Sequence, residues 1–328
     1  MTWCIIANGR PIQEGLEVAV ATGASLLKEG QSAVNAVTEA IRILENDPRF
    51  DAGIGCDMNL NGLILMDASI MEGKNLNGGA IGAVSGIKNP ILVAKKVMDI
   101  IPNVFLVGKH AEDFAKKLAS KYPEIVVNFD ASTIRTRKKL IEAVKVLSNE
   151  MSIKEILKKS TCASDVIFQL LLEGKLEKVR QRLNELNHGT VSVVALDQNG
   201  NFSAGASTGG WTLGLPGRIG DSPLLGCGAY ADNDKGAAST SGIKGEENVR
   251  LGGLTRIICD HMKNKISSMQ ATNWVTEYVH EKIGFTIKRG SLIAIDLQGK
   301  PGFNISHKAS SQGVSYLREG MNKPRYLV

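Results

Sequence analysis

Two runs of residues around a turn constrain the fold of this chain more than any other stretch. The first, TVSVVALD at Thr190–Asp197, alternates and is rich in β-branched residues, and the second, FSAGAST at Phe202–Thr208, can return beside it. Between them lies Gln198-Asn199-Gly200, which has the composition of a tight turn. The sequence therefore predicts an antiparallel β-hairpin.

The length of the turn decides which residue faces Thr190. A two-residue loop sets Thr190 opposite Gly209, whereas a three-residue loop that closes on Gly200 in the left-handed region sets it opposite Thr208. We predict the second register. It places two hydroxyls on one face of the sheet, with about 4.5–5.5 Å between their Cβ atoms.

Gly189 precedes Thr190, and this pair permits a reaction of the main chain. Glycine tolerates conformations closed to other residues, so Gly189 can carry strain that exposes its carbonyl to the Thr190 hydroxyl. An N-to-O acyl shift and hydrolysis of the ester would free Thr190, whose α-amine, with a pKa of ~7.7–8.0, can act as base for its own hydroxyl. Taken alone, a glycine and a threonine entering a strand are an ordinary structural feature, so the hypothesis depends on what surrounds them.

Several further motifs stand in fixed order around the hairpin. They are LENDPRFDAGIG (44–55), NGLILMDASIMEG (61–73), KNPILVAKKVM (88–98), GASTGG (205–210), LPGRIGDSPLLGCGAYADN (215–233) and TSG (240–242). The chain resembles the plant-type asparaginase family of N-terminal-nucleophile hydrolases, which includes isoaspartyl peptidases, and more distantly the glycosylasparaginases. The resemblance runs through most of the chain, and GRIGDSP is its most specific part.

This resemblance implies an architecture and a maturation step. The fold expected is α+β, a single domain over 1–328 built as a four-layer αββα sandwich with two central antiparallel sheets. Cleavage before Thr190 would give an α subunit, 1–189, which ends in a charged helical linker at 130–189, and a β subunit, 190–328. The two would stay together because the sheets draw strands from both, and relatives form homodimers of such αβ units.

The resemblance also assigns roles within the expected site. Thr190 is the nucleophile, and Thr208 polarises or orients it. Arg218 pairs with the substrate α-carboxylate and Asp221 receives its α-ammonium, which agrees with the way a guanidinium and a carboxylate read a free amino-acid end. The oxyanion hole falls on the Ser241 hydroxyl and the Gly242 amide, with Thr240 as second candidate.

No cofactor is required by this chemistry, but the resemblance implies a structural sodium ion. In several relatives a loop wraps sodium with main-chain oxygens, and the corresponding residues here are Leu44, Glu45, Asp47, Phe50, Ala52 and Ile54. Carbonyl ligation of a hard cation leaves almost no side-chain signature. A plain rigid loop is the alternative.

The expected substrates are L-asparagine and β-aspartyl dipeptides. Gly189 favours these over sugar-linked asparagine, because the glycosylasparaginases typically have Asp there; that activity is the runner-up. The sequence departs from the family at ANGR (Ala7–Arg10), which keeps one glycine of a usual His-Gly-Gly, and at Asp51, where asparagine is usual. These departures favour a rival interpretation, an unprocessed binding protein. Trp211 would narrow the site and argues against a second rival, a protein-directed protease.

Composition limits the other classes. The net charge of +6 comes from basic residues that are spread out and lack an aromatic platform, so we expect no nucleic-acid partner. The five cysteines stand singly, which indicates reduced thiols without a zinc site or disulfide framework. No apolar run reaches the length of a membrane span, and the N-terminus lacks a signal pattern, so we expect a cytoplasmic protein without a membrane partner.

Periodicity predicts the remaining elements. Strands are expected at 3–7, 65–71, 79–84, 104–107 and 290–297, with one further edge strand in FNISHKASSQGVSY (303–316). Helices are expected at 13–27, 32–44, 89–101, 110–121, 248–264 and 269–283, and within the linker at 139–147 and 165–179. Ser32 and Asn89 are predicted helix caps, and Asp67 is interpreted as a buried carboxylate that accepts bonds from backbone donors.

Overall fold

The computed structural model describes residues 2–59, 61–141, 189–212, 214–242, 245–284, 290–305 and 312–328. The predicted hairpin is formed by β5 (Val191–Leu196) and β6 (Phe202–Thr208). Val191 pairs with Ser207, so Thr190, one residue further along, faces Thr208. The turn closes with a bond from Asp197 N to Asn201 O of 3.0 Å, and Gly200 has a φ of +80°. The three-residue loop and its register are confirmed.

This hairpin lies inside an eight-stranded sheet whose order is β12-β11-β1-β5-β6-β2-β3-β4. The strands from before Thr190 are β1 (Cys4–Gly9), β2 (Met66–Glu72), β3 (Gly78–Val84) and β4 (Phe105–Val107). The others besides the hairpin are β11 (Gly313–Arg318) and β12 (Arg325–Leu327). The hairpin is therefore clamped on both sides by strands from the first half of the chain.

One edge of this sheet differs from the prediction of purely antiparallel sheets. β4 pairs parallel to β3, with Ala80 opposite Phe105. Between the two strands runs the helix α3 (Pro90–Ile100), which returns the chain to the end of the sheet where β3 began. A helical crossover of this kind makes the following strand parallel, whereas a tight hairpin makes it antiparallel.

A second, four-stranded sheet has the order β10-β9-β8-β7. Its strands are β7 (Ala229–Asp232), β8 (Gly236–Ser241), β9 (Ser291–Ile295) and β10 (Pro301–Ile305). All four follow Thr190, so the expectation that both sheets draw strands from both halves holds only for the larger sheet. Apolar side chains from the facing sheets, including Ile6, Val194 and Ile293, form a shared core.

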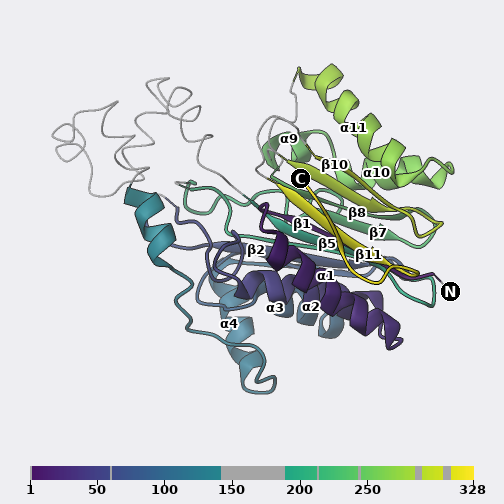
Figure 1. The fold of residues 1–328 in the computed structure, drawn as a ribbon. Coiled ribbons are helices and arrows are strands. Elements are labelled where there is room, and N and C mark those ends of the chain that lie inside the picture. The colour runs from purple at the N-terminus through teal and green to yellow at the C-terminus, as the bar shows by residue number, and fades with distance from the viewer. Residues whose placement is uncertain are drawn as a thin grey trace.

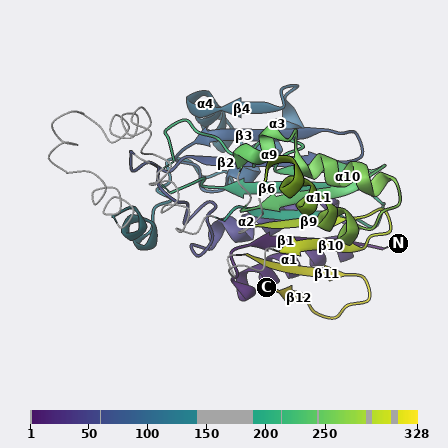
Figure 2. The same cartoon turned by 90° about the horizontal axis from the view of Figure 1, so that it is seen from above.

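Helices cover the outer faces of the two sheets (Figures 1 and 2). α1 (Gln13–Lys28), α2 (Ala33–Asn46) and α3 pack on the larger sheet, and α4 (Gly108–Ala119) lies against β3 and β4. α10 (Leu254–Lys263) and α11 (Ser268–Ile283) pack on the smaller sheet. Each helix presents a stripe of buried residues at helical spacing, which is what anchors it.

Helix ends show which local predictions hold. The Ser32 side chain accepts a bond from Asn35 N at 3.2 Å, as a cap should. Asn89 makes no such bond; its amide donates to Glu45, and Glu45 instead accepts from Ile91 N, so a carboxylate on α2 caps α3. The expected helix 248–264 is broken into α9 (Gly245–Arg250) and α10 by Gly252 and Gly253, both at positive φ.

The C-terminal prediction of one edge strand over 303–316 is wrong. Residues 301–305 form β10, an edge of the smaller sheet, whereas residues 313–318 form β11, which lies between β12 and β1 in the larger one. Sequence periodicity does not reveal that two adjacent strands enter different sheets.

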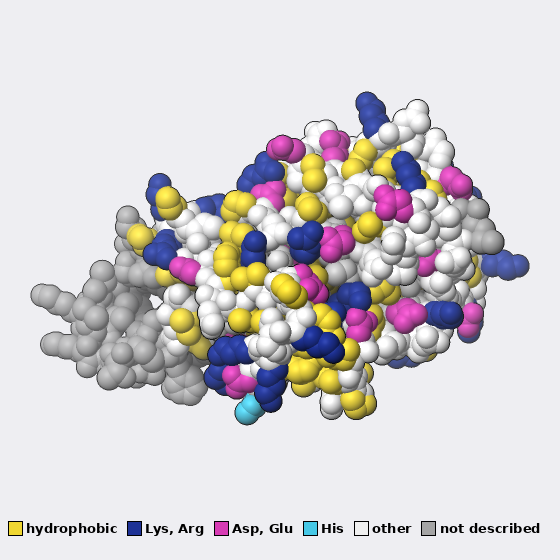
Figure 3. All heavy atoms as spheres, turned by 90° about the horizontal axis from the view of Figure 1, so that it is seen from below, with side chains coloured by type: hydrophobic (Ala, Val, Ile, Leu, Met, Phe, Trp, Pro, Cys, Tyr) yellow, Lys and Arg dark blue, Asp and Glu magenta, His cyan; other side chains and the backbone are white. Residues whose placement is uncertain are grey.

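The linker helix expected at 165–179 lies outside the described residues, and of the one at 139–147 only residues 139–141 are described, within a helical segment at 134–141. Among the described residues, no helix is both long and apolar enough to cross a bilayer. The face shown in Figure 3 carries basic and acidic side chains intermingled, so the net charge is not gathered there into one basic patch.

Candidate active site

Thr190 stands at the entrance of β5, between groups from several elements. Its Oγ1 lies 3.3 Å from Ser222 Oγ, and its carbonyl oxygen accepts a bond from the Ser241 hydroxyl. Thr208, although opposite in register, accepts a bond from Gly210 N at 3.1 Å. The hydroxyl that lies in hydrogen-bonding distance of Thr190 Oγ1 is therefore that of Ser222, not that of Thr208.

Gly189 is held by packing. Its N–H donates to Asp51 Oδ2 at 3.4 Å, and a Cβ placed on it would lie 3.0 Å from Arg10 Cγ. Gly189 is not among the glycines with positive φ, so the left-handed strain that glycine would permit is not used here. Glycine fits this position because the surroundings leave little room for a side chain.

Ser241 and Thr240 end β8 and serve different partners. Besides Thr190 O, the Ser241 hydroxyl reaches Gln312 Oε1 at 2.8 Å. The Thr240 hydroxyl donates to Asp221 Oδ2 at 3.1 Å. Of the two oxyanion candidates, Ser241 is therefore the one on the side of Thr190, and Gly242 follows it at a φ of +67°.

Asp221 is a buried carboxylate held by neutral donors. Its Oδ2 accepts from Asn248 Nδ2 at 2.7 Å as well as from Thr240, and burial raises its pKa. A Cβ placed on Gly245 would lie 2.9 Å from Asp221 Oδ1 and 3.3 Å from Arg218 Nη2. The predicted carboxylate and guanidinium thus face one common space, which a glycine keeps open.

Arg218 is fixed from two sides. Its Nε donates to Glu246 Oε1 at 3.0 Å, and its guanidinium lies over the Trp211 ring, 4.5 Å from the centroid. Stacking on an aromatic ring and pairing with a carboxylate restrict the rotamers of a long side chain. The arrangement keeps Nη1 and Nη2 directed toward Gly210, Gly220 and Gly245, whose missing side chains leave room.

A cluster of buried charges lies behind Gly189. Asp57 accepts bonds from Lys139 and from Thr212 Oγ1, and the guanidinium groups of Arg10 and Arg135 lie 3.9 Å away. Burial alone would raise the pKa of Asp57, but the charges of Lys139 and Arg10 hold it below its usual value. Neighbouring Asp51 has its pKa raised to about 6 by burial and by the charge of Asp57. Two residues of the predicted linker, Arg135 and Lys139, thus belong to this cluster.

Asp67 is satisfied by the backbone, as predicted. Its two oxygens accept bonds from Ala83 N at 2.8 Å and Gly220 N at 3.4 Å, and burial raises its pKa to about 6. By holding Gly220, it fixes the loop that carries Arg218. Among the described residues, Cys4, Cys56, Cys227 and Cys259 are buried and unpaired.

The predicted sodium loop is tightly curled by glycines. A Cβ on Gly53 would lie 2.4 Å from Glu45 O, and one on Gly55 would lie 2.5 Å from Pro48 O and 2.7 Å from Phe50 O. Main-chain oxygens of the loop therefore lie close against these two glycines. Arg135 Nη2 also donates to Phe50 O, at 3.3 Å.

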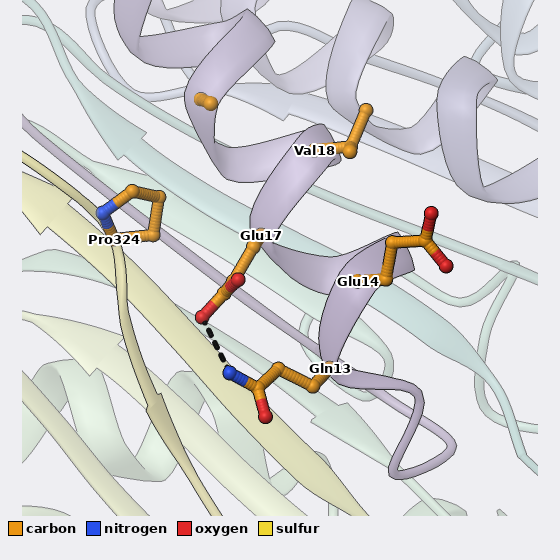
Figure 4. A pocket seen from close by; sticks show the side chains of 6 residues that line it. Gln13, Glu14, Glu17, Val18 and Pro324 are labelled. Carbon is orange, nitrogen blue, oxygen red and sulfur yellow. Dashed lines mark hydrogen bonds between the residues drawn. The ribbon is translucent and has the colours of Figure 1, made fainter.

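The groove drawn in Figure 4 is a separate feature. It lies between α1 and the segment before β12, and its lining comprises Gln13, Glu14, Glu17, Val18, Ala21 and Pro324. None of these residues belongs to the candidate site. Inside the groove the Gln13 amide donates to Glu17, and Glu14 at its edge pairs with Arg49.

Comparison with known proteins agrees with this geometry. The model of the family described as asparaginase matches residues 7–322. The chain belongs to the asparaginase family. An isoaspartyl peptidase/L-asparaginase of Mus musculus is 38% identical over 83% of this chain and 73% of its own length. A plant-type L-asparaginase of Pyrococcus abyssi is 35% identical over 95% and 92%, and an isoaspartyl peptidase of Escherichia coli 37% over 92% and 83%.

Sequence reasoning about this member of the asparaginase family missed several residues of the site. Ser222 could have been identified from the sequence, because this serine directly follows Asp221 in the GRIGDSP motif. Asn248 and Gln312 carry no local signal, since a lone amide in a helix or a loop is usually a solvated side chain. Both meet the site only through the tertiary fold.

Proposed function

We propose that this chain is a self-activating threonine hydrolase that cleaves β-aspartyl amide bonds, with L-asparagine and isoaspartyl dipeptides as substrates. Membership of the asparaginase family supports the reaction class. The names of the similar proteins from mouse, Pyrococcus abyssi and Escherichia coli support the substrates.

Maturation begins with the peptide bond before Thr190. Thr190 Oγ1 attacks the Gly189 carbonyl carbon, the C–O bond forms, the C–N bond breaks, and the hydroxyl proton ends on the released amine. Water then hydrolyses the ester, which leaves Gly189 with a carboxylate and Thr190 with a free α-amine. Ser222 supports this step because its hydroxyl is within 3.3 Å of the attacking oxygen and can orient it.

Turnover repeats the acyl transfer on a bound substrate. The α-amine of Thr190 takes the hydroxyl proton as Oγ1 attacks the side-chain amide carbonyl, and the amine or ammonia leaves with that proton. Water releases aspartate from the acyl-enzyme and restores the hydroxyl. For the oxyanion, the Ser241 hydroxyl is the side-chain donor closest to Thr190.

Recognition rests on the shared space in front of Gly245. Arg218 would bind the substrate α-carboxylate through its Nη atoms, while Asp221 Oδ1 would receive the α-ammonium. Because Asn248 and Thr240 occupy Oδ2, the other carboxylate oxygen remains for the ligand. This space would therefore recognise a substrate with a free α-carboxylate and a free α-ammonium group.

The observation that carries the proposal is a closed circuit of contacts around the nucleophile. Thr190 contacts Ser222 and Ser241, and their chain neighbours Asp221 and Thr240 are bonded to each other. The nucleophile, the oxyanion donor and the Asp221 carboxylate that would bind the substrate ammonium are thereby held in one unit, whose parts come from different segments of the chain.

Intact mass of the purified protein, fresh and aged, tests this proposal. We expect two fragments that divide at Gly189-Thr190, with asparagine hydrolysis appearing alongside them, and a single chain for Thr190→Ala. Thr190→Ser, which keeps a hydroxyl, should still be cut. A wild-type chain that persists at 35.1 kDa under all conditions would overturn the proposal in favour of a binding protein.

The structural sodium ion remains part of this proposal. The expected ligands are the main-chain oxygens of Leu44, Glu45, Asp47, Phe50, Ala52 and Ile54. Glu45 O already accepts a bond from Ile54 N and Phe50 O one from Arg135, so a bound sodium ion would share these oxygens with their donors. Bound there, sodium would brace the loop that carries Asp51. Thermal melting in sodium chloride against choline chloride at equal ionic strength tests it; equal Tm values would contradict it.

We further propose that the two sheets and their outer helices form the four-layer αββα sandwich of N-terminal-nucleophile hydrolases. The shared core between the sheets and the helices on their outer faces support this.

The cleaved α and β subunits, 1–189 and 190–328, would remain joined through the larger sheet and assemble as homodimers of αβ units. Light scattering of the cleaved protein measures the assembly.

A further inference from the structure

The side chain of Gln312 holds a buried donor that lacks a partner. The residue is 2% exposed and directly precedes β11. Its Oε1 lies 2.8 Å from Ser241 Oγ and shares the single hydrogen of that hydroxyl with Thr190 O, but its Nε2 has no hydrogen-bond partner within the described part of the chain. Leaving such a donor unpaired costs about 1–3 kcal/mol, so its retention calls for an explanation.

The unpaired amide lies beside the scissile residue. A Cβ placed on Gly189 would be 3.6 Å from Gln312 Nε2. The backbone that carries Gln312 is firmly placed, because Gly313 pairs with Gly9 of β1 and has Tyr326 Oη within 2.7 Å of its own Cβ position. Gln312 is therefore presented to Gly189 from a rigid strand end.

Self-cleavage needs a donor at this location. Negative charge develops on the Gly189 carbonyl oxygen, which lies on the N-terminal side of Thr190. The Ser241 hydroxyl is bound to the carbonyl of Thr190 itself, and Asp51 accepts a bond from the Gly189 N–H. Arg10 Nε is as near as Gln312, but its guanidinium also faces Asp57 and donates to Arg49 O.

We propose that the Gln312 side-chain amide donates a hydrogen bond to the Gly189 carbonyl oxygen during self-cleavage, and that this donor does not act in turnover. The proposal rests on the self-activation proposed above. Gln312 donates no proton in the reaction; the proton passes from Thr190 Oγ1 to the amine. In turnover the attacked carbonyl belongs to the substrate, so the Gln312 donor has no corresponding role, although Gln312 Oε1 still contacts Ser241.

The test compares Gln312→Met and Gln312→Glu with Gln198→Met. Met removes both amide atoms at similar length, whereas Glu keeps the acceptor for Ser241 and removes the donor. Gln198 lies in the hairpin turn, where its amide donates to Leu27 O, and so controls for a glutamine-to-methionine change. Intact-mass time courses give cleavage rates, and asparagine hydrolysis per cleaved chain gives turnover.

We expect both Gln312 variants to cleave about 10²-fold more slowly, which is the usual effect of one oxyanion donor, and Gln198→Met to match wild type. Once aged to full cleavage, Gln198→Met should have wild-type kcat/KM, and the two Gln312 variants, whose contact with Ser241 is altered, should lose much less in kcat/KM than in cleavage rate. Wild-type cleavage rates in both Gln312 variants would overturn the inference, as would an equal loss in cleavage and turnover. If the wild-type protein itself is not cleaved, the proposed function is overturned instead. That outcome is distinguishable, because the intact mass of wild type then stays a single chain, as that of Thr190→Ala does. Should Gln312→Met melt early, its cleavage is followed at a lower temperature at which circular dichroism shows it folded, because the charge of Glu can itself slow cleavage by repelling the oxyanion.

Discussion

Asp57 and Asp221 are both buried carboxylates, yet the chain stabilises them in opposite ways. Asp57, behind Gly189, is surrounded by the cations of Arg10, Arg135 and Lys139, and the charges of Lys139 and Arg10 hold its pKa low. Asp221, which precedes the Ser222 that contacts Thr190, accepts hydrogen bonds from the neutral donors of Asn248 and Thr240.

This difference in partners distinguishes a carboxylate with a structural role from one that can bind a cationic ligand. When protein cations balance a charge, no ligand is needed, and removing one member leaves the others buried and unpaired. When neutral dipoles make the direct hydrogen bonds to a charge, its field remains available to a bound cation. In the proposed mechanism Asp221 receives the substrate ammonium in this way, whereas Asp57 ties the start of the predicted linker to the loop that holds Gly189.

The largest effect on stability is expected from removing the charge of Asp57. Asp57→Asn leaves the surrounding cations without their shared carboxylate, so we expect a loss of about 3–5 kcal/mol in the free energy of unfolding. Urea denaturation at pH 7 measures it. Asp113→Asn, in the exposed pair with Lys109 on α4, is the control and should show no measurable change. Equal stabilities of the two variants would mean that the cluster is not charge-balanced.

On the substrate side, Arg218→Lys tests whether a ligand completes the site. Lysine keeps the charge but loses the planar fork and the stacking on Trp211, so kcat/KM for asparagine should fall by about 10²-fold, mainly through KM. The unfolding free energy should change little, because Arg218 pairs with the partly exposed Glu246. Arg256→Lys, on an exposed face of α10, serves as control. A kcat loss at constant KM would contradict a binding role.

Asp67 sharpens the comparison, since backbone donors hold it and no ligand is expected there. Its pKa of about 6 exceeds the ordinary 3.8, so the folded state binds more protons between these values, and stability falls as pH rises from about 4 to 6. Asp67→Asn should remove that fall, shifting the difference from wild type by about 2 kcal/mol in the variant's favour between pH 4 and pH 7. Urea denaturation at several pH values measures it; parallel profiles would contradict it.

The sequence predicted what depends on local pattern or on contiguous motifs. The β5–β6 register followed from the loop that Gly200 closes, and the Ser32 cap and the backbone-held Asp67 also followed from short stretches. The parallel β4 and the strands entering different sheets depend on the path of the chain in space. Local sequence therefore does not determine them.

The missed site residues share the same physical cause. Arg135 and Lys139 lie in a basic, glutamate-rich segment that reads as a solvated helix, and only the position of Asp57 in the fold shows that they are partly buried. Asn248 and Gln312 are single amides far in sequence from the partners that they meet. Long-range polar contacts of this kind leave no periodic signal.

Asn248→Ala gives the smallest effect and the most direct test of the neutral-donor side. Without the Asn248 amide, Asp221 Oδ2 loses its shortest hydrogen bond, so the pKa of Asp221, already raised by burial, rises further. Only the ionised carboxylate attracts the substrate ammonium. KM for asparagine should therefore rise about 10-fold at pH 5 and less at pH 8, in line with the loss of one charge-assisted bond, with kcat nearly unchanged. Asn304→Ala, an exposed amide bonded to Asn273, controls for the substitution. A KM increase of the same size at both pH values would show that Asn248 acts by packing alone. Thr240 would then be the neutral donor that distinguishes Asp221 from Asp57.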